Sequence, residues 1–188
     1  MEGFAKSKDV HRTLIRIFDS YFKDNGFKRN RSDNCAYSRS DGATSETFTA
    51  FEVECSQFSQ DWTGGDFTMN GARSVKNTKH LGGRHSRFLR LMDDSHLSEA
   101  LETQARIARR MPDLPVDHPA IANTMLPDPE GAKWRELILH RRDPRVFRWE
   151  PGADHWCNYF SVDDVQEWGR FLLPRILPLL DRIPPGSG

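Results

Sequence analysis

The chain has 188 residues, with 27 Lys or Arg and 27 Asp or Glu, so its formal net charge is zero. This length is typical of one domain, and it is enough to bury a core without disulfides or metals. Zero net charge disfavours a dedicated nucleic-acid binder, because such proteins usually carry an excess of cations that displaces counterions from phosphates.

The three cysteines, Cys35, Cys55 and Cys157, show no repeated spacing. They therefore indicate a reducing, cytoplasmic compartment rather than a disulfide framework. The N-terminal residues lack the apolar run of a signal peptide, and no stretch approaches the roughly 20 apolar residues that span a bilayer. We expect no membrane association, one domain over residues 1–183, and a tail over residues 184–188 that lies outside the fold.

The first predicted element is an amphipathic helix. Its apolar stripe recurs at steps of three and four residues, at Val10, Leu14, Ile17, Phe18 and Tyr21. Asn25 and Gly26 are expected to end the helix, because Gly adopts the left-handed conformation of the C′ position. Phe27 is then expected to pack back on the helix.

An antiparallel meander of three strands is predicted next. The first strand surrounds Cys35 and Tyr37, the second runs over 48–58, and the third over 67–73. In the second strand Phe51, Val53 and Cys55 alternate with polar neighbours, which is typical of a strand buried on one face. A turn near residues 43–45 would bring Cys35 close to Cys55.

The second half of the chain is predicted to be mainly helical. Residues 88–92 fit either a short helix or a strand, and a longer helix begins near Asp94 and ends at Pro112. A Pro-rich connection covers 112–129, a further helix 130–142, and short strands lie within 146–149 and 155–160.

The last helix has the clearest start signal. Ser161 followed by Asp164 resembles a capping box, and Pro174 and Pro178 predict a kink or restart. The whole order predicts an α+β fold with an N-terminal helix, an antiparallel meander, and then several helices, of which the C-terminal one packs on the sheet.

The first third of the chain contains Gly26-Phe27-Lys28 at a helix end, a basic stretch leading into a hairpin, and Phe67-Thr68-Met69-Asn70 in a later strand. In this order it resembles, over residues 10–75, an uncharacterised family of small bacterial α+β domains of unknown function. The resemblance implies the fold and carries over no catalytic residue. Some small bacterial domains of this size are immunity proteins against toxins. This is an analogy of size and class, and a fold does not fix a function.

The spacing of the Cys and His residues gives little support to a metal site or to a catalytic nucleophile. His155 and Cys157 lie two apart and would share one face of a strand, but a structural zinc site needs four ligands, usually in paired spacings. A Cys–His nucleophile requires a fold that joins the two side chains, and no Gly-x-Ser-x-Gly motif is present. The sequence favours a binding role over an enzymatic one, and we assign no catalytic residue and no cofactor.

Basic clusters support a second hypothesis. They occur at 28–31, at 84–90 and at 140–148, the last beside Trp134, Phe147 and Trp149. Such clusters, with aromatic side chains on which bases can stack, would suit a nucleic-acid-associated domain.

The leading prediction is a protein-binding module, of an immunity type or an accessory type. Trp and Arg are favoured at the centres of protein interfaces. The predicted contact residues are therefore those of one loop and one Arg-rich segment, namely Asp61, Trp62, Arg84, His85 and Arg87. A nucleic-acid-associated domain, and an enzyme or metal protein that uses Cys or His, are the alternatives.

Overall fold

The structure is a computed structural model, and it describes residues 4–30, 34–42, 47–56, 64–74, 81, 86–110 and 156–184. These residues form the predicted α+β fold, with an N-terminal helix, an antiparallel sheet, and helices that include a C-terminal one. The expectations for 43–45, 112–129, 130–142 and 146–149 lie outside the described residues. Among the helices that are described, none combines the length and the apolar character needed to cross a bilayer.

The elements follow one another along the chain as helices (α), strands (β) and 3-10 helices (η). They are α1 (Ser7–Asp24), β1 (Lys28–Arg29), β2 (Ala36–Ser40), β3 (Phe48–Cys55), β4 (Gly65–Ser74), β5 (Ser86–Arg87), η1 (Phe88–Leu91), α2 (Asp94–Arg110), β6 (Cys157–Tyr159), α5 (Val162–Leu172), η2 (Leu173–Arg175) and α6 (Ile176–Asp181). The segment that fitted either a helix or a strand is thus a 3-10 helix, η1.

Helix α1 ends as the sequence predicts. Gly26 has a φ of 80°, its N–H donates to the Lys23 carbonyl at 3.1 Å, and the Phe27 N–H donates to the Phe22 carbonyl at 2.9 Å. These two bonds make a Schellman motif, in which a left-handed residue closes the helix. The rings of Phe22 and Phe27 lie 5.0 Å apart, so the chain turns directly from α1 into β1.

The sheet is a meander, with the order β1-β2-β3-β4-β5 and antiparallel pairs throughout. The longest ladder joins β3 to β4, from Phe48 opposite Ser74 to Cys55 opposite Phe67. The other edge of β4 is shared, because β6 pairs with its beginning and β5 pairs with Asn70 and Gly71. Segments far apart in the sequence therefore meet along one strand.

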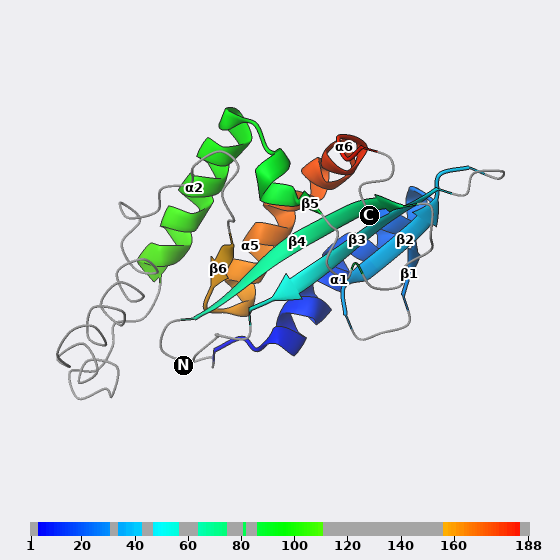
Figure 1. The fold of residues 1–188 in the computed structure, drawn as a ribbon. Helices are drawn as coiled ribbons and strands as arrows, with labels where there is room; N and C mark the ends of the chain where they lie inside the picture. Colours follow the sequence, from blue (N-terminus) through cyan, green and yellow to red (C-terminus); the bar gives the residue numbers. More distant parts are fainter. Residues whose placement is uncertain are drawn as a thin grey trace, which may run out of the picture.

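One face of the sheet carries the hydrophobic core, and Figure 1 shows α1 and α5 behind the sheet on that side. Phe51, Phe67 and Met69 point into this core and are almost fully buried. Trp168 of α5 is also fully buried, and its indole N–H donates to the carbonyl of Asn158 in β6 at 2.8 Å. We call this the first face of the sheet.

Gly71 allows the C-terminal part of the chain to pack closely on β4. A Cβ atom at this position would lie 2.5 Å from Phe88 Cε1, 2.6 Å from Ile183 Cδ1 and 2.9 Å from Leu180 Cδ2. Ordinary carbon contacts are about 3.5–4.0 Å. The missing side chain is therefore what lets η1 and the end of α6 approach the centre of the sheet.

The capping box at the last long helix is present as predicted. Asp164 N–H donates to Ser161 Oγ at 3.2 Å, and Asp164 Oδ2 accepts the N–H groups of Ser161 and Phe160 at 2.8 and 3.0 Å. After α5 the chain passes through η2, which contains Pro174, and resumes as α6, which is the predicted restart.

Candidate functional site

Of the five predicted contact residues, Arg87 alone lies in the described part of the chain, and Asp61, Trp62, Arg84 and His85 lie outside it. Arg87 is the last residue of β5 and pairs with Asn70 of β4. Its side chain lies on the side of the sheet opposite the core. We call this side the second face, and define it by Glu52, Glu54, Asp66, Thr68, Asn70, Arg87 and Asn158.

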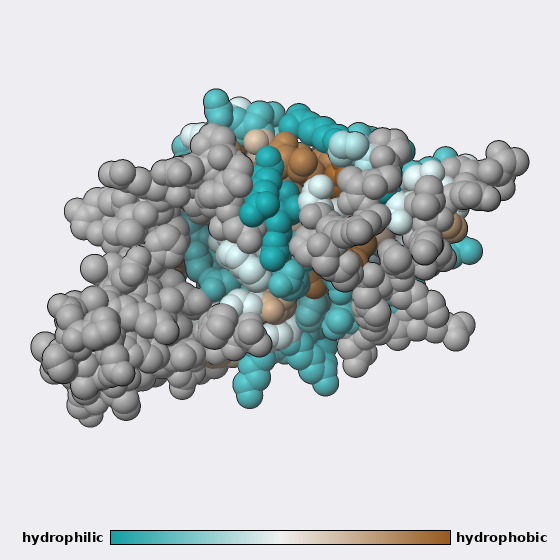
Figure 2. Space-filling view, in the orientation of Figure 1, coloured by the Kyte–Doolittle hydropathy of each residue, from teal (hydrophilic) through white to brown (hydrophobic). Residues whose placement is uncertain are grey.

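The second face is polar along β4. Asp66, Thr68 and Asn70 alternate with the core residues Phe67 and Met69, because successive side chains of a strand point to opposite faces. The three polar residues are 9%, 0% and 3% exposed. In Figure 2, which views this side, hydrophilic side chains gather at the centre of the described surface. The alternation itself is the sequence signal for these residues, although only its apolar half entered the prediction.

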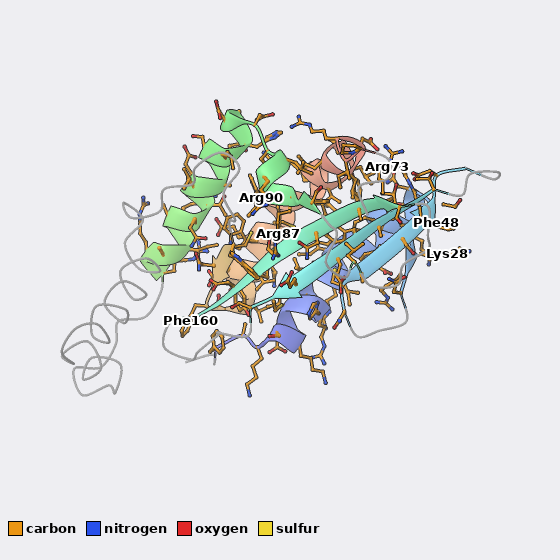
Figure 3. All side chains as sticks on the ribbon, viewed as in Figure 1. Lys28, Phe48, Arg73, Arg87, Arg90 and Phe160 are labelled. Atoms are coloured by element: carbon orange, nitrogen blue, oxygen red, sulfur yellow. The ribbon has the colours of Figure 1, made fainter. Side chains whose placement is uncertain are left out.

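Arg87 is held in place by three neighbours. Its Nη1 donates to Glu54 Oε2 at 2.8 Å and to Asn70 Oδ1 at 3.3 Å. The guanidinium carbon lies 5.0 Å from the ring centroid of Trp156, which is a cation–π contact. Asn70 Nδ2 donates to the same Glu54 oxygen at 2.8 Å, so the three polar groups form one closed network. Figure 3 shows Arg87 beside β4.

A second set of polar contacts fixes β6 against its neighbours. The side-chain amide of Asn158 donates to Asp66, and its backbone N–H donates to Gln104 Oε1 of α2 at 3.0 Å. Gln104 is fully buried, so this contact is shielded from water. Since Trp156 precedes Asn158 by two residues, the same contacts hold Trp156 on the second face beside Arg87.

The predicted proximity of Cys35 and Cys55 is found around His11 of α1. The Cys35 N–H donates to His11 Nδ1 at 3.1 Å, and His11 Nε2 lies 3.7 Å from Cys55 Sγ. Because Nδ1 accepts a hydrogen bond, the proton of the neutral imidazole is on Nε2, which therefore donates toward the sulfur.

The protonation of this pair does not suit nucleophilic catalysis. Burial lowers the pKa of His11 and so favours the neutral ring. Burial also raises the pKa of the Cys55 thiol to about 12. A catalytic Cys–His pair needs a thiolate beside a base or an imidazolium. Here the thiol keeps its proton, and the imidazole nitrogen that faces it is a donor.

Cys157 lies in β6 with its side chain fully buried in the core. Burial, with a smaller contribution from the charge of Asp66, raises the pKa of this thiol well above its usual value. His155, the other weak candidate ligand, lies outside the described residues. Within the described ranges, no group of three or more His, Cys, Asp or Glu side chains is placed to hold a metal ion.

The described parts of the basic clusters lie at two separate places. Lys28 and Arg29 form the edge strand β1, whereas Arg87 and Arg90 lie at β5 and η1. Figure 3 shows Lys28 and Arg73 at one end of the sheet and Arg87 away from that end. The cluster at 140–148 lies outside the described residues.

The motifs behind the family resemblance have structural roles in the described chain. Gly26-Phe27-Lys28 closes α1 and opens β1, and Phe67 to Asn70 forms the centre of β4. Comparison of the chain with models of protein families, with curated proteins and with solved structures found no match.

Proposed function

We propose that this chain is a protein-binding module, and that the partly exposed residues Arg87 and Trp156 of the second face make the contact. The observation that carries this proposal is the fixed position of Arg87 between Glu54, Asn70 and the Trp156 ring. Arg and Trp are enriched among residues that dominate binding energies. A guanidinium already ordered in the free protein loses little conformational freedom when a partner docks, which favours affinity.

The chemistry of the described residues supports binding over catalysis. All three cysteines are free, and burial raises the pKa of each thiol, so thiolate chemistry is disfavoured at these positions. The chain has no net charge, which favours a protein partner over a nucleic acid. An immunity-type module, acting on a toxin in a bacterial cytoplasm, is one form of this proposal.

The test compares two arginines in matched surroundings. Arg175 also pairs with a carboxylate, that of Glu99, and lies 4.1 Å above the ring of Phe171. Its side chain is 17% exposed and that of Arg87 is 16% exposed. Lys keeps the charge but loses the planar fork that stacks on a ring. Arg87→Lys and Arg175→Lys should therefore cost similar stability, while only Arg87→Lys should weaken a complex made through the second face.

The measurement is a pull-down from the native host with and without nuclease, using wild-type protein and both variants, followed by quantitative mass spectrometry and affinity measurement. We expect a stoichiometric protein whose affinity falls about 10-fold, or about 1.4 kcal/mol, with Arg87→Lys and stays unchanged with Arg175→Lys. Equal recovery of every protein with both variants would refute a contact through Arg87. Recovery that disappears with nuclease would favour the nucleic-acid alternative.

A further inference from the structure

A groove lies where α1 turns into β1, at the end of the sheet away from Arg87. Its volume is about 570 Å³, and its polar wall is made by Asp19, Lys23, Lys28, Arg29 and Asn30. We call it the corner groove. Ligand sites commonly have volumes of about 300–1,000 Å³, so the corner groove is large enough for a small ligand.

The charge of the corner groove is unbalanced. Among the described residues that line it, three cations, Lys23, Lys28 and Arg29, face a single carboxylate, that of Asp19. Asp19 is itself shared, because its Oδ1 lies 3.9 Å from Arg29 Nε and accepts the Tyr37 hydroxyl at 3.4 Å. The chain as a whole carries equal numbers of cations and anions, so this surplus is local.

Hydrogen bonds to the carbonyls at the end of α1 do not account for these cations, although Lys23 lies in the last turn, where a cation favours the helix dipole. The last carbonyls of a helix need donors, and nearby cations often supply them. The carbonyls of Phe22 and Lys23 accept the N–H groups of the Schellman motif. The Tyr21 carbonyl accepts the side-chain amide of Asn25, and the Asn25 carbonyl accepts the Arg39 guanidinium. Every one of these carbonyls is satisfied without either lysine.

The lysines also have no ionic partner within the described ranges. No salt bridge to Lys23 or Lys28 occurs there, whereas Arg39 and Arg73, beyond Gly26, both pair with Asp41. Among the described residues, neither ammonium group donates to these carbonyls or joins an ion pair, so both remain available to an anion.

We propose that the corner groove binds a phosphate group through Lys23, Lys28 and Arg29. Ammonium groups act as point charges on phosphate, and a guanidinium adds directed hydrogen bonds. The aromatic side chains of the groove, Phe27 and Tyr37, are 3% and 1% exposed and offer no platform on which a base could stack. Recognition is therefore of the phosphate itself, on a small phosphorylated molecule or on a nucleic-acid backbone.

The test is an NMR titration of the ¹⁵N-labelled protein with sodium pyrophosphate at constant ionic strength. We expect saturable shifts of the amides of residues 26–30, and a dissociation constant raised at least 10-fold by Lys23→Glu or Lys28→Glu. Lys8→Glu, an exposed residue near the start of the same helix, is the matched control and should leave binding unchanged. Lys23→Gln and Lys28→Gln should give intermediate losses, which separates charge from any effect on folding.

Two results would overturn the proposal. One is a shift that grows linearly with pyrophosphate and is spread over the surface, as sodium chloride would produce. The other is unchanged affinity in both Glu variants. Titration with a 10-nucleotide single strand distinguishes the two sources of the phosphate. Binding that is 10-fold tighter than that of pyrophosphate, and equally sensitive to Lys23→Glu, indicates a nucleic-acid backbone. Binding weaker than that of pyrophosphate indicates a small molecule. Arg87→Lys should not affect any of these titrations, so this proposal and the protein-binding proposal fail independently.

Discussion

Replacing Gly71 by Ala tests how the C-terminal helix packs on the sheet. The added Cβ would meet Phe88, Leu180 and Ile183, all at distances between 2.5 and 2.9 Å. Each of these side chains is at most 1% exposed, so none can swing into solvent to make room. The new methyl group must therefore push η1 or α6 away from β4, or force the three side chains from their preferred rotamers.

The expected cost follows from these contacts. Each neighbour must retreat by up to about 1 Å to reach an ordinary contact of about 3.5 Å. Overpacking of this kind costs about 1–3 kcal/mol. Ala is otherwise better than Gly in a strand by about 0.5–1 kcal/mol, which offsets part of the strain. We expect Gly71→Ala to lower the free energy of unfolding by about 1–2 kcal/mol.

Urea unfolding followed by circular dichroism measures this change, with Ile183→Val as the partner in a double-mutant cycle. Val lacks the Cδ1 atom of Ile183 that the new Cβ would meet at 2.6 Å. Ile183→Val alone should cost about 1 kcal/mol. The double variant should be more stable than the sum of the two losses predicts, by at least about 0.5 kcal/mol. A Gly71→Ala protein as stable as wild type, or strict additivity, would refute this account of the packing.

Gly26→Ala should lower the free energy of unfolding by about 1 kcal/mol, because nothing lies within 4 Å of the new Cβ and only the left-handed backbone is strained. Gly26→Asn should lower it less, because Asn tolerates this conformation better. Equal urea midpoints for the two variants would contradict this reasoning. Burial lowers the pKa of His11 below its usual 6.5, so the folded state disfavours its protonation, and stability should fall as the pH drops below about 6.5. His11→Gln should flatten this dependence in urea midpoints measured from about pH 5 to pH 7.5, and an unchanged slope would mean that another group is responsible. Asp164→Ala leaves two backbone N–H groups without their acceptor and should lower the free energy of unfolding by about 2–4 kcal/mol. Asp163 is an exposed residue in the same turn, so Asp163→Ala should lower it by less than about 1 kcal/mol. Thermal unfolding of the two variants checks the difference.

Local patterns in the sequence determined most of the described fold. The stripe from Val10 to Tyr21 with Gly26 after it predicted α1 and its C-terminal end, and the pair Ser161 and Asp164 predicted the start of α5. These signals depend on hydrogen bonds and contacts between residues only three to six positions apart. The alternation around Phe51 and Phe67 likewise predicted β3 and β4 and their antiparallel order, because a short connection joins strands that lie side by side.

The tertiary structure alone decided how the two candidate surfaces, the second face and the corner groove, are assembled. Arg87 was predicted as a contact residue, but its partners Glu54, Asn70 and Trp156 come from three other strands or their flanks, and no local spacing relates them. The position of His11 beside Cys55, and the burial that keeps the Cys55 thiol protonated, follow from the packing of α1 on the sheet. Contacts of this kind join residues tens of positions apart in the sequence, so they depend on strand register and helix packing.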